Sequence, residues 1–262
     1  MTEWDARKYA QISDLQAAMA AEVLALAQLN GNERVLDVGC GNGRVTSGIA
    51  AKLLGGSVRG VDASRDMIAF AQSQYPATTH PNLAFEVADA RDLKFENEFD
   101  LVVSFNALHW VPDQERALRG IRAALKPGGR AQLRLVPLGP RKSLETVLEE
   151  TRKSPRWAQY FSGFSDPYLR LTQDEYAALA ARCGFHVDRV HTGDKLWDFG
   201  SHEAFCAFGS VTFVEWSRKI PEDQKSAFIT DVLDRYRAAV SIGPTDSNTF
   251  RFYQMDIALS LR

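Results

Sequence analysis

The chain has 262 residues, of which 45% are hydrophobic and 24% charged, so it can bury a sizeable core without disulfides or metals. Its formal net charge is -2 at pH 7, and Lys and Arg form no local run, which disfavours nucleic acid as a partner. No stretch is apolar for long enough to cross a bilayer, and the N-terminus lacks a signal-like apolar run. We therefore expect a cytoplasmic protein that does not insert into a membrane.

The first half of the chain alternates between helices and strands. Apolar residues at helical spacing predict a helix over 13–27, and a short run that is apolar on both faces predicts a central strand over 34–38. Further helices are expected at 45–54, 64–74 and 114–125, and further strands at 57–61, 83–87, 99–105 and 130–136. Gly128 and Gly129 separate the last helix from the last strand. Five strands joined by short crossovers indicate a doubly wound α/β fold.

The second half is organised differently, because residues 139–171 are rich in Pro, Arg and aromatic residues. The expected elements are helices at 143–152, 173–183, 201–211 and 221–240 and strands at 185–191 and 249–261. We expect one domain over residues 1–262 with a mostly parallel, seven-stranded sheet. The core sheet comprises about 30–136, 185–191 and 249–261. Insertions at about 137–171 and 193–248 are expected to form a helical lid over the C-terminal edge of the strands, where open α/β sheets bind ligands.

Three cysteines, Cys40, Cys183 and Cys206, lie far apart in the sequence. An odd number at such spacings matches neither a disulfide framework nor a set of metal ligands. We therefore expect reduced, buried thiols and no bound metal.

The turn after the first strand reads Asp-x-Gly-x-Gly-x-Gly, from Asp37 through Gly39 and Gly41 to Gly43. Glycines let the backbone take positive φ and approach a ligand closely. The last glycine follows two residues after the second, whereas the dinucleotide fingerprint needs three. The turn instead resembles motif I of class I S-adenosylmethionine-dependent methyltransferases, which have a Rossmann-like fold. The resemblance implies that the turn wraps the amino-acid moiety of S-adenosylmethionine, with Asp37 near its ammonium group.

Two further acids end neighbouring strands. Asp62 ends the second strand, where an acid can bond ribose hydroxyls, and Asp89 follows the third, where the family places an acid or its neighbouring N–H groups around adenine. The other expected cofactor contacts are Ala63, Ser64, Met67, Ala90 and Asn106. Acids at the ends of three successive strands, combined with the three glycines, favour a methyltransferase over an NAD or FAD enzyme.

The segment after the fourth strand runs Asn106-Ala-Leu-His109-Trp110-Val-Pro-Asp-Gln114. It resembles a stretch shared by juvenile hormone acid methyltransferases and trans-aconitate methyltransferases, which esterify the carboxylate of small organic acids. In this fold the segment lies beside the reactive methyl group. The resemblance therefore implies that His109 and Trp110 face the acceptor.

The likeness to the juvenile hormone acid group covers most of the chain. Tyr9 followed by Gln16 matches its N-terminal pattern, and Pro155–Trp157 and Ile220–Asp223 match it more loosely in the second half. This family places a Gln and a Trp around the substrate carboxylate. By position, these residues are Gln16 and Trp110.

A carboxylate acceptor suits these residue types. Its unperturbed pKa is about 4, so it is ionised at neutral pH and needs alignment and partial desolvation instead of a general base. The Gln16 amide and the Trp110 indole N–H can hold one oxygen while the other attacks. We therefore expect O-methylation of a small, hydrophobic organic acid, with S-adenosylhomocysteine as the second product.

Two other functions are weighed against this one. His109 can serve as general base in O-, N- or C-methylation of a natural-product scaffold. Packing beside Trp110 is the favoured explanation for His109, because the sequence shows no carboxylate to orient its ring. A non-catalytic protein that binds S-adenosylmethionine is the third possibility, and the aromatic-rich insertions argue against it.

Aromatic residues gathered outside the expected sheet suggest a pocket for a bulky apolar acceptor, although each alone is better explained as a core residue. They are Trp4, Trp157, Tyr160, Phe161, Phe164, Trp197, Phe199 and Trp216. Arg134, Arg141 and Arg251 are candidates for a second charge of an acidic substrate. Solvated surface is the favoured explanation for each arginine.

Overall fold

The computed structural model describes residues 13–240, 243, 246 and 248–261, without the side chains of residues 13–18 and 20. The chain divides into two compact units. The first comprises Met1–Pro137, Leu169–Thr192 and Met255–Arg262, and the second comprises Leu138–Tyr168 and Gly193–Gln254. The prediction that the inserted segments act as a lid stays a prediction.

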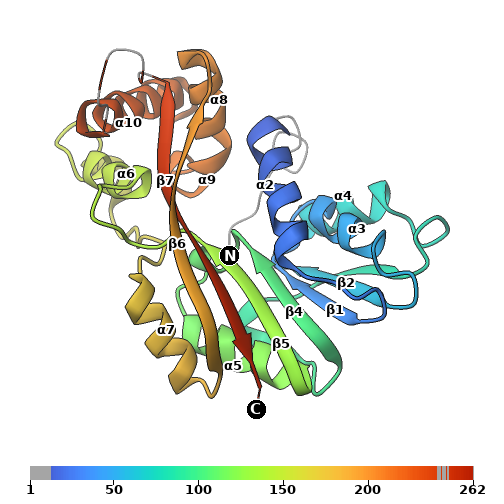
Figure 1. Ribbon diagram of the computed structural model, residues 1–262. Coiled ribbons are helices and arrows are strands. Elements are labelled where there is room, and N and C mark those ends of the chain that lie inside the picture. Colours follow the sequence, from blue (N-terminus) through green and yellow to red (C-terminus); the bar gives the residue numbers. More distant parts are fainter. Residues whose placement is uncertain (1–12, 241–242, 244–245, 247, 262) are drawn as a thin grey trace. The chain divides into compact units, whose positions relative to one another are not determined.

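A seven-stranded sheet has the order β3-β2-β1-β4-β5-β7-β6 (Figure 1). Its strands are β1 (Arg34–Val38), β2 (Ser57–Asp62), β3 (Leu83–Val87), β4 (Phe99–Phe105), β5 (Leu125–Leu135), β6 (His186–Asp198) and β7 (Thr249–Ser260). The strands β1 to β5 pair in parallel, and β7 runs antiparallel to β5. The chain reverses its direction of winding between β1 and β4, which is where open α/β sheets bind ligands. The predicted fold class is confirmed.

Helices cover both faces of the sheet in the first unit (Figure 1). They are α2 (Ser13–Leu26), α3 (Arg44–Ala50), α4 (Arg65–Gln74), α5 (Gln114–Ala124) and α7 (Gln173–Arg182). Within β1, Val35 packs into the core that contains α3 and α4, whereas Leu36 and Val38 pack into the core that contains α5 and α7. This alternation buries both faces of the strand, as its continuous apolar run predicts.

The second unit contains helices around an aromatic core. Its elements include α6 (Leu144–Arg152), α8 (His202–Thr212), α9 (Val214–Ser217), α10 (Lys225–Val240) and the 3-10 turns η3 (Ala158–Phe161) and η4 (Glu222–Gln224). The indole N–H of Trp157 donates to Asp231 at 2.7 Å, and that of Trp216 donates to Glu149 at the same distance. Both indoles are fully buried, so Trp157 and Trp216 are core residues of this unit. This agrees with the expectation that each aromatic residue, taken alone, is better explained by the core than by an acceptor pocket.

Two strands are longer than the sequence predicts. β5 begins at Leu125 because Gly128 and Gly129 form an irregularity inside the strand instead of ending it, and the register shifts opposite Phe99. β6 continues to Asp198, through residues that the sequence pattern assigns to an insertion. The predicted strand ends too early because the polar composition of these residues hides the strand pattern. In the part of the chain that the structure describes, no helix is both long and apolar enough to cross a membrane.

Candidate functional site

The glycine turn after β1 packs too closely for side chains at two of its three glycines. A Cβ on Gly39 would lie 2.1 Å from the Cβ of Ala107, and one on Gly43 would lie 2.6 Å from the ring of Phe85. Gly41 differs, because no heavy atom of the described part of the chain lies within 4 Å of the position of its Cβ. All three glycines have positive φ, at 80°, 52° and 79° in chain order. The middle of the turn therefore presents bare backbone to open space.

Asp62, at the end of β2, fastens this turn. Its Oδ2 accepts the N–H of Gly41 at 2.9 Å, and its Oδ1 accepts the N–H of Ser64 at 2.9 Å. Ser64 in turn begins α4 by accepting the N–H of Met67, which is buried beneath it. The acid predicted to contact a ligand thus also orders the ends of two elements.

Asp37 is buried at the end of β1, with 2% of its surface exposed. The Thr46 hydroxyl donates to its Oδ2 at 2.7 Å. Burial raises the pKa of Asp37 to about 7; the Thr46 hydrogen bond lowers the pKa, and the nearby charge of Asp62 raises it further. Cys40, the next buried side chain of the turn, is 8% exposed, and burial raises the pKa of its thiol well above the usual range.

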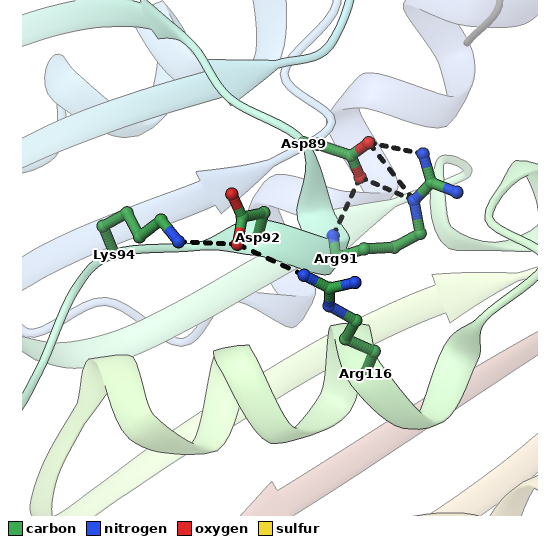
Figure 2. Close-up of polar contacts among 5 residues, drawn as sticks. All are labelled: Asp89, Arg91, Asp92, Lys94 and Arg116. Atoms are coloured by element: carbon green, nitrogen blue, oxygen red, sulfur yellow. Dashed lines mark hydrogen bonds and ion pairs between the residues drawn. The ribbon is translucent and has the colours of Figure 1, made fainter.

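Asp89 begins the short 3-10 turn η1 (Ala90–Asp92) and is already paired with an arginine (Figure 2). Its Oδ1 accepts the backbone N–H of Arg91 at 2.9 Å, and its Oδ2 lies 2.6 Å from the guanidinium of the same residue. The hydrogen bonds from Arg91 lower the pKa of Asp89 and keep it ionised. Figure 2 also shows Asp92 between Lys94 and Arg116, an exposed set of charges.

Asn106 is the first residue after β4 and has a left-handed backbone, with φ 57°. Its N–H donates to the carbonyl of Arg134 at 2.7 Å, which fixes the chain in this conformation. The side-chain Oδ1 is buried and has no hydrogen-bond partner within residues 13–240, 243, 246 and 248–261. A strained backbone and an unsatisfied buried acceptor, both at the ligand-binding edge of the sheet, are typical of a binding position.

His109 and Trp110 lie on the 3-10 turn η2 (Leu108–Trp110) directly after this residue. The His109 ring is 5% exposed, and its Nδ1 accepts the N–H of Val136 at 3.3 Å. Burial lowers the pKa of His109 to about 3, so the ring is neutral at physiological pH. The half-buried Trp110 ring lies 5.9 Å from it, centroid to centroid.

The predicted cofactor residues therefore gather at the carboxyl ends of β1 to β4. Gln16 lies on α2, but its side chain is outside the part of the chain that the structure describes, as are Trp4 and Tyr9. Sequence reasoning gave Gln114 no role, yet this buried side chain donates to the carbonyls of Leu108 and Val111. In the sequence it stands at the end of the segment 106–114, which resembles juvenile hormone acid and trans-aconitate methyltransferases, and is the first residue of a helix after an acidic cap. Neither signal predicts its contacts.

The expectation that three arginines are solvated on the surface is wrong for Arg134, whereas Arg141 and Arg251 are partly exposed and lie in ion pairs. Arg134 is 3% exposed, and its guanidinium binds Asp256 at 2.6 Å and Glu22 at 2.9 Å. Arg141 pairs with Asp194, and Arg251 pairs with Asp246, within the second unit. Each guanidinium already has a carboxylate partner, because burial of an arginine requires one.

Known proteins are similar to this chain in sequence and in fold. Residues 35–129 match the family model described as a methyltransferase domain. Trans-aconitate 2-methyltransferase of Methylobacterium nodulans is 29% identical over 249 residues, which cover 92% of this chain and 90% of that protein. The solved YcgJ protein of Bacillus subtilis has a TM-score of 0.67 at 19% identity, covering 94% of this chain and 99% of that one.

A second solved structure, phosphoethanolamine N-methyltransferase 2 of Haemonchus contortus in complex with S-adenosyl-L-methionine, has a TM-score of 0.61 at 19% identity. It covers 94% of this chain and 53% of that one. The fold, the glycine turn and the matching domain together identify the chain as a class I methyltransferase. Its cofactor is S-adenosylmethionine.

Proposed function

We propose that this methyltransferase O-methylates the carboxylate of a small, hydrophobic organic acid. The single observation that carries this proposal is the state of His109, the base that the alternative function requires. Bound S-adenosylmethionine supplies an electrophilic methyl group. An acceptor that carries a proton on its reacting atom needs a base in the protein, whereas an ionised acceptor does not.

A histidine acts as a base through an unprotonated ring nitrogen that can take up a proton. In His109 that nitrogen is Nδ1, and it already accepts the N–H of Val136. The ring proton is therefore on Nε2, which can donate a hydrogen bond but not accept a proton. Burial, which lowers the pKa of His109 to about 3, weakens the base further. An acceptor that is already ionised, such as a carboxylate, fits this site, whereas a phenol or an amine needs a base.

The relatives support the same class of acceptor. Trans-aconitate 2-methyltransferases align over nearly the whole chain, and their name specifies an organic acid. We further propose that Trp110 and Gln16 hold one carboxylate oxygen through neutral N–H donors. Neutral donors orient the acceptor without the strong ion pair that would weaken it as a nucleophile.

The turn and the residues after β4 fit the cofactor. We propose that Asp37 receives its ammonium group, because a cation beside this buried carboxylate favours the ionised form. The open backbone at Gly41 leaves room for a ligand against the turn. Asn106 offers a buried oxygen that lacks a partner in the structure.

Asp62 is the proposed ribose ligand. Its carboxylate accepts the N–H groups of Gly41 and Ser64, which hold it at the carboxyl end of β2, and a carboxylate oxygen is a suitable acceptor for a ribose hydroxyl. Asp89 is the proposed neighbour of adenine, held in place by Arg91. The remaining proposed contacts are Gly39, Gly43, Ala63, Met67 and Ala90.

The acceptor class is tested by release of S-adenosylhomocysteine against a panel of fatty, isoprenoid, aromatic and tricarboxylic acids, with phenols and amines of matched size. We expect turnover of acids only, and the product should be a methyl ester by mass spectrometry. Turnover confined to phenols or amines would overturn the proposal and restore His109 as base.

Trp110 tests the proposed role of its N–H group. Trp110→Phe keeps an aromatic ring but removes the donor, and we expect the acceptor KM to rise about tenfold with unchanged affinity for S-adenosylhomocysteine. Gln16→Ala should behave in the same way. Equal loss of cofactor affinity in either variant would show that the residue does not act on the acceptor.

We also propose that the second unit acts as a lid that excludes water during methyl transfer. Hydrogen exchange measured with and without S-adenosylhomocysteine tests this role. We expect slower exchange in residues 138–168 when the cofactor product is bound. Exchange that changes only in the glycine turn would contradict the lid.

A further inference from the structure

A buried amide spans the turn that carries the acceptor-facing residues. Gln114, the first residue of α5, is 3% exposed. Its Nε2 donates to the carbonyl of Leu108 and to the carbonyl of Val111, the latter at 2.9 Å. Leu108 is the first residue of η2, and Val111 directly follows its last residue. One side chain thus bonds both ends of the turn that holds His109 and Trp110.

Tyr176 holds the other end of this amide. Its hydroxyl donates to the Oε1 of Gln114 at 3.1 Å, from a fully buried position on α7. The carbonyls of Leu108 and Val111 can only accept hydrogen bonds, so the NH2 group of the amide must face them. The amide oxygen then faces Tyr176 and accepts its hydroxyl proton in a hydrogen bond. Burial raises the pKa of Tyr176, so the phenol stays a donor across the physiological range. All the polar atoms of this amide are therefore used.

A main-chain hydrogen bond adds a second attachment. The N–H of Leu169 donates to the carbonyl of His109 at 2.9 Å. Leu169 begins the segment of the first unit that leads into α7. The turn η2 is thereby held by Gln114 of α5, whose amide Tyr176 of α7 orients, and by the backbone before α7.

We infer that Gln114 is a positioning residue for methyl transfer: its amide holds η2 in the one geometry in which His109 and Trp110 meet the acceptor. The inference rests on the proposed function insofar as η2 faces the acceptor. Gln114 acts through the turn, with its polar atoms engaged by Leu108, Val111 and Tyr176. The glycine turn is fastened separately, to Val61 and Asp62, so we expect cofactor binding to depend much less on this amide than acceptor turnover does.

Gln114→Met tests the inference, because it keeps the length of the side chain and removes its donors and its acceptor. We expect kcat/KM for the acceptor to fall about tenfold to a hundredfold, with affinity for S-adenosylhomocysteine changed less than about twofold. Tyr176→Phe leaves both carbonyl bonds in place, so its kcat/KM should fall only about threefold. Wild-type kinetics in Gln114→Met, or a parallel loss of cofactor affinity, would overturn the inference.

Gln132 provides a matched control. It is another buried glutamine, 4% exposed on β5, but its Nε2 has no hydrogen-bond partner among the residues that the structure describes. Gln132→Met therefore makes the same chemical change in the same unit without touching η2, and we expect unchanged kinetics. Equal losses in Gln132→Met and Gln114→Met would mean that activity responds to any core substitution, which contradicts a specific role for Gln114.

Hydrogen exchange gives a readout that needs no acceptor. The N–H groups of Trp110 and Val111 donate to the carbonyls of Ala107 and Leu108, and we expect them to exchange faster in Gln114→Met. If the wild-type protein methylates no acid, the proposed function fails while this result can still hold. Unchanged exchange would overturn the positioning role whatever the acceptor is. Gln114→Asn, with a shorter amide, provides the second variant should Gln114→Met not fold.

Discussion

Burial holds the pKa of Asp37 at about 7, and the neighbouring charge of Asp62 adds to the effect, while the Thr46 hydroxyl opposes it. Without a cation beside it, a large part of the population is protonated at neutral pH. Because the folded pKa lies above the unfolded one, Asp37 contributes stability below about pH 4, and this contribution is lost as pH rises through about 7. Binding of an ammonium group reverses this loss by favouring the ionised form.

Cofactor affinity should therefore depend on pH. We expect the affinity for S-adenosylhomocysteine, which carries the same ammonium group, to fall about tenfold per pH unit below the pKa of Asp37 and to level off above it. In Asp37→Asn the affinity should be low and independent of pH. Isothermal titration calorimetry between about pH 5.5 and 8.5 measures both. A flat wild-type profile would contradict an ammonium partner for Asp37.

At the scale of elements, the sequence predicts the strands β1, β3 and β4 with their observed bounds, because short apolar runs end at acids or polar residues. It does not predict what the acids bind. Asp62 accepts the N–H of Gly41, although the two residues are 21 positions apart in sequence. The hydrogen bond forms because β1 pairs with β2. Gln114 was missed for the same reason, since its partner Tyr176 is 62 residues away. The spacing in the sequence predicts which residues lie at the carboxyl-terminal edge of the sheet. Tertiary packing determines which of these residues contact each other.

The glycine turn offers a matched pair of substitutions. In Gly39→Ala the new Cβ meets the Cβ of Ala107 at 2.1 Å, and φ is 80°. In Gly41→Ala the backbone is also left-handed, but the space is open. We expect Gly41→Ala to lower the free energy of unfolding by about 1 kcal/mol and Gly39→Ala by clearly more. Thermal denaturation measures the difference. Equal losses would show that backbone strain alone, not the close approach, requires Gly39.

At the scale of the whole first unit, Arg134 joins three parts of the fold. Its guanidinium binds Glu22 on α2 and Asp256 on β7, and its carbonyl accepts the N–H of Asn106. Its side chain is only 4% exposed. A guanidinium can form a forked pair with a carboxylate, as it does with Asp256, where two nitrogens donate to two oxygens. The residue considered for a substrate charge instead stabilises the sheet that carries the site.

Arg134→Met should lower the free energy of unfolding by about 3–5 kcal/mol, because it leaves the largely buried carboxylate of Asp256, whose side chain is 14% exposed, without its partner. The control is Arg34→Met, which breaks an exposed pair with Glu98 and should cost less than about 1 kcal/mol. Urea denaturation at neutral pH measures both variants. If both variants lost less than about 1 kcal/mol, water would be able to replace the Arg134 guanidinium as the partner of Asp256.

Cys40 gives the glycine turn a chemical property of its own. Thiolates react with alkylating reagents, and the pKa of this thiol is raised first by its burial and further by the charges of Asp37 and Asp62, so it stays protonated and shielded. It can react only while the turn is open. Its labelling rate is therefore a natural kinetic reporter of turn opening, built into the chain without any introduced probe. A bound cofactor that closes the turn will protect it from modification.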